Sequence, residues 1–368
     1  MSISNSEDSK DDENSGAAES SRRSFLQAGA AIIAGASVAA CDDDIPKGKI
    51  PEPTEQQKAL KRKDRSRVYV KHVPSYEELG EIMMATMKEA NPPVKDKSVF
   101  LKLNLVDYRK GIPCCTNAAH VDALLQALIA AGAREIKVGD GPALSRDTEK
   151  IAALNGITDV CKKYDVQFVD LNIDDLEKVE NPLQYTKIPE FVLPRTIVKS
   201  EFLVSVPKLK THHWALMTCS MKNMFGVVPG RKYGWPKNVL HIRGIHQSIL
   251  DIVATVKPSF AVVDAVVAME GDGPLNGTAK ELNAIFMGDD LVAVDTVAGM
   301  CLELPVQNIA YLRIAGKVLG NTDLSQIDII GATIDSLKKK FLLPPTFEED
   351  GRPKDLSKLA KGAESGVT

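Results

Sequence analysis

Apolar residues recur along the chain in two alternating patterns, short β-rich runs and longer runs with helical spacing. The short runs predict strands over residues 67–70, 98–103, 135–138, 167–171, 201–206, 260–267, 284–287 and 327–330. The longer runs predict helices over residues 75–89, 120–131, 147–154, 157–164, 291–302 and 309–319. Strands separated by helices predict an α/β fold with a parallel-rich sheet and flanking helices.

The same patterns suggest how the chain is divided. The stretch 172–195 is irregular and contains three prolines, which is typical of a boundary between subdomains. We expect two α/β subdomains around a cleft. The expected divisions are a signal peptide over 1–40, a flexible tether over 41–65, subdomains over 66–195 and 196–343, and a loose tail over 344–368.

The N-terminal stretch predicts export. Arg22 and Arg23, followed by a weakly apolar run over 28–40, resemble a twin-arginine signal peptide. The run ends in Val-Ala-Ala-Cys, which resembles a lipoprotein box with Cys41 as the lipidated residue; an ordinary cleavage site beside a chance cysteine is the alternative. We expect passage through the twin-arginine machinery and a periplasmic or cell-surface lipoprotein held at the membrane by its lipid.

Composition narrows the class of ligand. The 368 residues carry a formal net charge of −3, and residues 1–40 hold six acids and three bases, which leaves 43 of each in the remainder. Because the remainder is neutral, we do not expect binding to nucleic acid through a bulk positive field. A local cluster of charge would suit a small ligand better.

Such a cluster lies in residues 202–250, which contain no Asp or Glu and are called the acid-free window below. A solvated face with countercharges elsewhere is one interpretation; a pocket that receives an anion or holds a metal is the other. Its basic side chains are Lys208, Lys210, His212, His213, Lys222, Arg231, Lys232, Lys237, His241, Arg243 and His246.

The centre of the window predicts an anion site. Strand alternation places Lys208 and Lys210 on one side, and His212 and His213 follow directly. Two cations beside two imidazoles suit a carboxylate or phosphate, with a general acid/base at hand. For either histidine a structural role is the alternative, and Lys222 is a further candidate for the cleft.

Three other features predict parts of the same site. Lys102 and Asn104 end a predicted strand, where α/β proteins bind ligands. Asp264 lies in an apolar strand, so its carboxylate needs a cation or histidine as partner. The turn 139–142 recurs as 271–274, Gly-Asp-Gly-Pro each time, so Gly271, Asp272 and Gly273 are expected at the cleft; two unrelated tight turns are the alternative.

Cofactor signals are weak. The cysteines form no Cys-x-x-Cys pair, so an iron-sulfur cluster is not expected. His241 and His246 are five residues apart, which is poor spacing for zinc on one helix, and a metal ion stays open as an alternative. Trp214 and the methionines 217, 221 and 224 recur at helical spacing and predict core packing. The stretch 226–238 is predicted to be a flexible lid.

With these motifs in place, the chain resembles the bacterial and archaeal family known as domain of unknown function 362. The matching segments are 102–104, 116–117, 131–133, 138–141, 207–212, 222–230, 263–264, 270–274 and 288–290. The resemblance implies an α/β fold and, often, twin-arginine export. Many members carry a ferredoxin-like segment, and this sequence shows none, so redox chemistry is less expected for it.

A more distant similarity is to the nickel-pincer lactate racemase family. His212 or His213, Lys222 and the segment 228–230 follow an order similar to that family's His and Lys-x-x-x-Pro-Gly. The family's Asp-x-Thr-Arg signature is missing, so the similarity implies a domain arrangement and not the nickel cofactor.

The sequence therefore favours an exported, lipid-anchored enzyme for a small anionic substrate. Lys102, Lys208, Lys210 and Lys222 would bind the anion, His212 or His213 would transfer a proton, and Asp264 would orient a partner. A non-catalytic periplasmic anion-binding lipoprotein is one alternative, and a metal- or redox-linked accessory protein is another.

Overall fold

The structure is a computed structural model that describes residues 50–143 and 147–354. The predictions for Arg22, Arg23 and Cys41 fall outside these residues. So do the expected signal peptide and the outer parts of the expected tether and tail.

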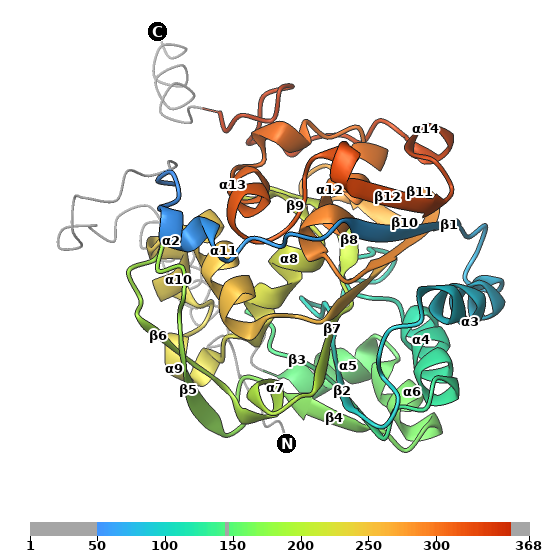
Figure 1. The fold of residues 1–368 in the computed structure, drawn as a ribbon. Helices are drawn as coiled ribbons and strands as arrows, with labels where there is room; N and C mark the ends of the chain where they lie inside the picture. The colour runs from blue at the N-terminus through green and yellow to red at the C-terminus, as the bar shows by residue number, and fades with distance from the viewer. Residues whose placement is uncertain (1–49, 144–146, 355–368) are drawn as a thin grey trace, which may run out of the picture. The chain divides into compact units, whose positions relative to one another are not determined.

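The elements alternate between strands and helices for most of the chain (Figure 1). The strands are β1 (Ser66–His72), β2 (Ser98–Lys102), β3 (Glu135–Asp140), β4 (Gln167–Asp170), β5 (Leu176–Glu180), β6 (Glu190–Pro194), β7 (Phe202–Ser205), β8 (Lys208–His212), β9 (Leu216–Thr218), β10 (Phe260–Glu270), β11 (Thr278–Gly288) and β12 (Ile327–Gly331). The α-helices are α2 (Glu55–Lys58), α3 (Leu79–Ala90), α4 (Ala118–Ala130), α5 (Thr148–Leu154), α6 (Ile157–Lys163), α7 (Arg195–Val198), α8 (Ser220–Asn223), α9 (Gly230–Tyr233), α10 (Asn238–Ile242), α11 (Ile245–Val256), α12 (Leu291–Cys301), α13 (Ala310–Val318) and α14 (Ile334–Leu337). Short 3-10 helices are η1 (Met224–Val227), η2 (Val306–Asn308) and η3 (Leu324–Gln326).

One large sheet organises the described residues. Its strands follow the order β12-β1-β11-β10-β7-β2-β3-β4, and β8 pairs with both β10 and β9. The pairs β10/β7, β7/β2, β2/β3 and β3/β4 are parallel, whereas β11 is antiparallel to both of its neighbours. The predicted α/β class with a parallel-rich sheet is confirmed.

Helices cover both faces of the sheet. Along β2, Val99 and Leu101 belong to one hydrophobic core with residues of α3, α4 and α6. Phe100, between them, belongs to a second core with residues of α8, α11, α12 and α13. Since side chains alternate along a strand, β2 reads as a continuous apolar run because both of its faces are buried.

The register of the parallel strands brings their carboxyl ends together. Lys102, the last residue of β2, lies opposite Gly139 of β3 and Ser205 of β7. Ligands of open α/β sheets bind at such an edge. The sheet contains strands from both predicted subdomains, and the described residues belong to one compact unit. The division at residue 195 stays a prediction.

Several local predictions differ from the structure. The helix predicted over 75–89 begins later, since α3 starts at Leu79, and its N-cap Glu78 makes no side-chain cap bond. The stretch 172–195, predicted to be irregular, contains the antiparallel pair β5/β6. The segment 226–238 is packed and not a free lid, since Val227, Val228 and Tyr233 are buried in the core.

Trp214 and the three methionines that recur at helical spacing do not lie on one helix. Met217, Met221 and Met224 are fully buried, as the spacing predicts, but they lie on β9, α8 and η1 and not on one helix. Trp214 is 54% exposed, so it does not belong to the core. The helical spacing of these residues therefore does not reflect a single helix, because they belong to three short elements.

The segments flanking the sheet are partly ordered. Ile50 is buried against the second core, and the short α2 has a capping box formed by Thr54 and Gln57. Gln57 Nε2 also donates to Leu183 O at 2.6 Å. The described part of the expected tether is therefore attached to the sheet unit. In the expected tail, Phe347 is buried and pairs with Pro353 across a β-bridge.

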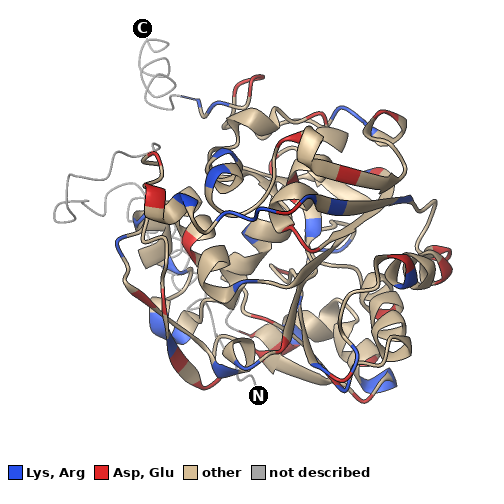
Figure 2. Ribbon diagram, in the orientation of Figure 1, with Lys and Arg blue, Asp and Glu red and all other residues tan. Residues whose placement is uncertain are grey.

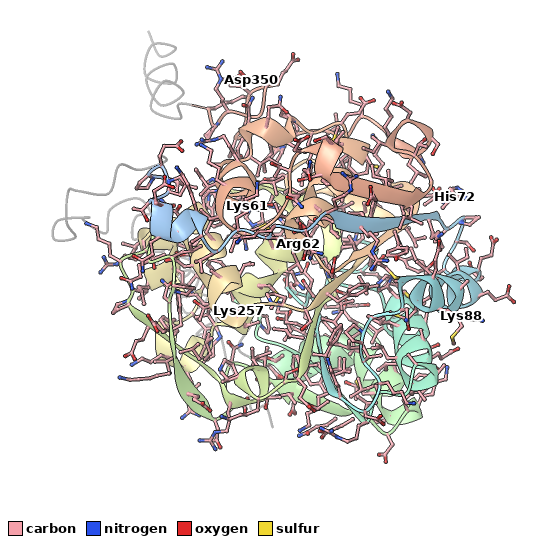
Figure 3. The ribbon with its side chains drawn as sticks, viewed as in Figure 1. Lys61, Arg62, His72, Lys88, Lys257 and Asp350 are labelled. Carbon is pink, nitrogen blue, oxygen red and sulfur yellow. The ribbon has the colours of Figure 1, made fainter. Side chains whose placement is uncertain are left out.

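Charged residues of both signs are interspersed over the outer elements (Figure 2). Most of their ion pairs are exposed, such as Lys178 with Glu190, and contribute little to stability. Arg62 and Lys257, labelled in Figure 3, line a cavity of about 370 Å³ beside the start of α12. The ion pairs at the carboxyl ends of the strands differ from these surface pairs because both of their side chains are buried.

Candidate functional site

A buried ion pair lies at the carboxyl ends of β2 and β3. Lys102 Nζ contacts Asp140 Oδ1 at 2.6 Å, and both side chains are at most 2% exposed. Lys102 also donates to Asn223 Oδ1 at 3.0 Å. The second carboxylate oxygen of Asp140 accepts the backbone N–H of Leu105. The predicted anion ligand Lys102 thus already has a carboxylate partner.

Three further lysines surround this pair without a carboxylate of their own. Lys210 Nζ donates to Cys114 O at 2.5 Å, and Lys237 Nζ donates to Gly141 O at 2.6 Å. Lys222 Nζ lies 4.3 Å from the ring centroid of Phe225. Among the described residues, none of the three forms an ion pair within 4.0 Å. Lys102, Lys210, Lys222 and Lys237 are called the lysine cluster below.

Burial and mutual repulsion weaken the charge on these three lysines. Burial lowers the pKa of Lys210 to about 8. Burial, together with the charges of Lys102 and Lys210, lowers the pKa of Lys222 to about 7. The pKa of Lys237 also falls to about 7, chiefly by burial and with Lys102 and Lys222 adding repulsion. Each ammonium would be stabilised by an anion between them.

Lys222 is the best placed of the cluster to meet a ligand. Its side chain is partly exposed, whereas Lys102, Lys210 and Lys237 are buried. The charge of Lys222 also lowers the pKa values of His212 and His241, after burial itself. One lysine therefore connects the cluster with the histidines of the acid-free window.

Aromatic rings form a continuous row beside Lys222. Successive ring centroids lie 4.9 Å apart from His212 to His213, 4.8 Å from His213 to Trp214 and 5.1 Å from Trp214 to His241. The row ends at Phe225, 5.2 Å from His241. Within this row Trp214 is exposed, whereas His212 and Phe225 are buried.

The two adjacent histidines differ in what they can do. His212 Nδ1 accepts the backbone N–H groups of Trp214 and Ala215 at 3.1 and 3.2 Å, which assigns its proton to Nε2. Protonation of Nδ1 would break both bonds. His213 is 30% exposed, and its Nδ1 lies 3.9 Å from Asp272 Oδ1. Of the two, His213 is the freer to exchange a proton.

Both Gly-Asp-Gly-Pro turns contact the acid-free window. In the second turn, Gly273 O accepts the backbone N–H of His213 at 2.9 Å, and Gly271 O accepts the Thr211 hydroxyl at 2.8 Å. A Cβ on Gly273 would lie 2.0 Å from Thr211 O, so this position requires glycine. The predicted ligands Gly271 and Gly273 therefore hold β8 and His213 in place through their carbonyls.

Asn104 has an unused acceptor. It is 8% exposed, and its Oδ1 has no hydrogen-bond partner among the described residues. Its backbone N–H donates to Thr116 Oγ1 at 2.9 Å, which fixes the loop. A buried amide oxygen without a donor is unfavourable by about 1–3 kcal/mol, so it is the kind of group that a ligand N–H or O–H would satisfy.

Asp264 and Lys208 form a second buried pair at β10 and β8. Their Oδ2 and Nζ atoms are 2.6 Å apart, with 0% and 2% side-chain exposure. Tyr76 OH donates to Asp264 Oδ1 and accepts from Lys208, each at 2.8 Å. The backbone N–H of Asn117, the N-cap of α4, completes the set at 2.9 Å. Asp264 thus has the cationic partner that the sequence predicts.

This second pair changes the roles of two predicted residues. Burial raises the pKa of Asp264, but Lys208, His120 and the Asn117 N–H together hold the pKa below its usual value. Both charges are therefore committed to each other. Lys208 does not join Lys210 as a free cation, although both lie on β8 with one residue between them.

Some site residues are not apparent from the sequence pattern. Lys237 enters the cluster from a segment predicted to be a lid, and Tyr76 reaches Asp264 across 188 positions. Asp140 had a signal, since it is the acid of the first Gly-Asp-Gly-Pro turn. His246 instead lies apart, stacked on Tyr311 with centroids 5.9 Å apart.

Two histidines that are neutral in the folded protein, His241 and His246, make its stability sensitive to acid. Burial and the Lys222 charge lower the pKa of His241 and of His246 to about 4, against about 6.5 in an unfolded chain. Their stabilising contribution is complete above pH 6.5 and is lost as the pH falls toward 4. We expect the free energy of unfolding to fall over this range by up to about 1.4 kcal/mol per pH unit for each histidine.

Urea denaturation between pH 4.5 and 7.5 checks this expectation. His246→Phe should reduce the slope below pH 6.5 relative to the wild type. Burial raises the pKa of Asp295 to about 6, so this carboxyl also titrates in the range. Because Asp295 is present in both proteins, the difference between their slopes reports on His246 alone. Equal slopes for the two proteins would contradict it.

Within residues 50–143 and 147–354, no three His, Cys, Asp or Glu side chains lie close enough together to hold a metal ion. In the same residues, no helix is both long and apolar enough to cross a membrane.

Comparison with known proteins finds a curated relative and several solved structures, two of which are described below. Thylakoid-associated protein sll1697 of Synechocystis sp. is 26% identical over 213 residues, which cover 56% of this chain and 63% of the relative. The chain thus spans less than two thirds of that protein.

The solved structures are more distant. The lactate racemase apoprotein of Thermoanaerobacterium thermosaccharolyticum shares 13% identity with a TM-score of 0.38, over 64% of this chain and 58% of that one. A Thermotoga maritima protein shares 13% with a TM-score of 0.35, over 69% of this chain and 59% of that one. Neither similarity bears on the site.

The family comparison covers the strands and loops that build the site. The family described as domain of unknown function (DUF362) matches residues 99–299, which include the lysine cluster, the row of rings and both Gly-Asp-Gly-Pro turns. This match is more than half of the chain, and it agrees with the motifs from Lys102 to Asp290. The chain belongs to the DUF362 family.

Proposed function

We propose that the lysine cluster binds a small carboxylate- or phosphate-bearing molecule. The observation that carries the proposal is the set of three cations, Lys210, Lys222 and Lys237, without a carboxylate partner around an acid that is already paired. Isolated buried cations are unfavourable. A bound anion would restore their balance of charge, and the partly exposed Lys222 gives it a point of entry.

The proposal extends to proton transfer by His213. Its imidazole is half-buried, near Asp272 and adjacent in the row to His212. Burial lowers its pKa, so it is neutral at pH 7 and able to accept a proton from a bound substrate. A non-catalytic anion-binding protein would have the same lysines but would not need this histidine.

The N-terminal sequence supports export of the protein and its attachment to a membrane. The twin-arginine pattern at Arg22 and Arg23 and the Cys41 box favour an exported lipoprotein. Palmitate labelling in the native host, compared with Cys41→Ser, tests the anchor. Absence of label in the wild type would contradict it.

Proton uptake tests the anion site. Because an anion raises the pKa values of Lys222 and Lys237 from about 7, we expect binding at pH 8 to take up protons. Affinity should fall as the pH rises above 7, by up to about tenfold per pH unit for each coupled lysine. Calorimetry with inorganic phosphate and with succinate, in two buffers of different ionisation enthalpy, measures the uptake.

The same titration separates the alternatives. Binding without proton uptake, and with an affinity independent of pH between 7 and 9, would contradict a site at these lysines. If binding occurs, His213→Gln distinguishes an enzyme from a binding protein. It should abolish turnover in a metabolite screen and leave phosphate affinity within about twofold, whereas a binding protein shows no turnover in either form.

A further inference from the structure

Two adjacent thiols lie in the loop between β2 and α4. Cys114 Sγ and Cys115 Sγ are 3.9 Å apart. Both point toward the same backbone oxygen, Asp107 O, at 3.3 and 2.9 Å. The two side chains therefore lie on the same side of the chain, which is what binding of one atom by both sulfurs requires.

A cavity leads to Cys115, whereas Cys114 is 1% exposed and does not line it. Its volume is about 390 Å³, and Cys115 lines it together with Thr116 and Asn117. Tyr76 and Lys208 lie on another part of its wall. Cys115 is only 6% exposed, so large reagents are excluded, while a molecule of a few atoms or one small ring fits the cavity.

A cation stands next to the thiols. Lys210 donates to the backbone oxygen of Cys114, and no carboxylate pairs with it among the described residues. The Cys115 thiol, and then Lys210, lower the pKa of Cys114 to about 6. The isolated Cys161 in the same core differs, since burial raises its pKa to about 11. A thiolate is thus available at neutral pH at this pair and not at Cys161.

Direct oxidation to a disulfide does not suit the pair. Adjacent Cα atoms across a trans peptide are about 3.8 Å apart, below the range of about 4.4–6.8 Å that disulfides prefer. A bridging atom between the sulfurs relaxes this constraint because it lengthens the link. We infer that Cys114 and Cys115 form a dithiol site that binds one small thiophilic centre, with trivalent arsenic as its chemical model, between both sulfurs.

The binding step needs no oxidant. With phenylarsine oxide, the first thiolate adds to arsenic, the second thiol follows, and the oxo group leaves as water. Two S–As bonds form and the As–O bond breaks; the departing oxygen takes one proton from the second thiol and one from solvent, and arsenic stays trivalent. Lys210 belongs to both sites, but the dithiol inference rests on the two sulfurs and not on the binding of an anion, since phenylarsine oxide is neutral.

Native mass spectrometry of the full-length protein with phenylarsine oxide tests the site. We expect one adduct per chain that survives excess 2-mercaptoethanol and is removed by dithiothreitol, because only a dithiol competes with a dithiol. Cys114→Ser and Cys115→Ser should each lower the amount of adduct that survives 2-mercaptoethanol at least tenfold. The matched control Cys161→Ser should keep it, and Lys210→Met should slow its formation at pH 7.

Two outcomes would overturn the inference. One is a retained adduct of wild-type strength in either Cys114→Ser or Cys115→Ser. The other is a wild-type protein, folded by circular dichroism, that forms no adduct resistant to 2-mercaptoethanol. If a serine variant fails to fold, Cys115→Ala serves in its place, because alanine keeps the small apolar volume of this buried position.

Discussion

Replacement of Asp264 by alanine is expected to lower the free energy of unfolding by about 3–5 kcal/mol, the range typical of breaking a buried ion pair. Among the described residues, the change would leave the Lys208 ammonium, 2% exposed, with Tyr76 OH and Val267 O as its remaining partners. It would also remove the acceptor of the Asn117 N–H at the start of α4. Urea denaturation followed by circular dichroism at pH 7.5 measures the loss.

A double variant provides the control. Lys208→Met with Asp264→Leu removes both charges and fills similar volume, so we expect it to be markedly more stable than Asp264→Ala alone. Glu190→Ala, at the exposed pair with Lys178, should change stability little. A loss of unfolding free energy below about 1 kcal/mol for Asp264→Ala would show that the Lys208–Asp264 ion pair does not stabilise the fold.

Lys222→Met is expected to weaken the binding of inorganic phosphate by about 10- to 100-fold, the equivalent of one charge-assisted hydrogen bond. Without phosphate, the variant should be as stable as the wild type or more stable. The reason is that Lys222 has no carboxylate partner among the described residues, and burial and repulsion lower its pKa to about 7. Opposite signs for binding and stability distinguish a ligand-binding lysine from a structural one.

Calorimetry and thermal unfolding on the same samples measure both effects. Lys222→Arg keeps the charge and should retain affinity better than Lys222→Met. Lys178→Met is the matched control, since it removes an exposed lysine that is paired with the exposed Glu190. Phosphate affinity equal to the wild type in Lys222→Met would place the anion elsewhere, and a large loss of stability would mark the residue as structural.

Much of the site was apparent from residue types near each other in sequence. The acid-free window, the alternation of Lys208 and Lys210, and the apolar strand around Asp264 are local patterns. The polar side chains of Lys102 and Asn104 follow a β-rich run, which places them at the carboxyl end of a strand. Because these signals depend on period and neighbours, no tertiary information is needed to recognise them.

Other features could not be found in this way. Lys102 pairs with Asp140 on the adjacent strand, and Lys208 pairs with Asp264, 56 positions away. The sequence shows four comparable lysines, and only the packing separates the two that are paired from Lys210 and Lys222. Trp214 and Met217 share one spacing, yet one is exposed and the other buried.

The sequence by itself thus determined the α/β class, the family and the concentration of cations and histidines in residues 202–250. The tertiary structure decided which of those charges are neutralised. It also brought Lys237 to the cluster and set Cys114 beside Lys210. The physical reason is that pairing and burial depend on which strand lies next to which, and this register joins residues that are distant in the chain.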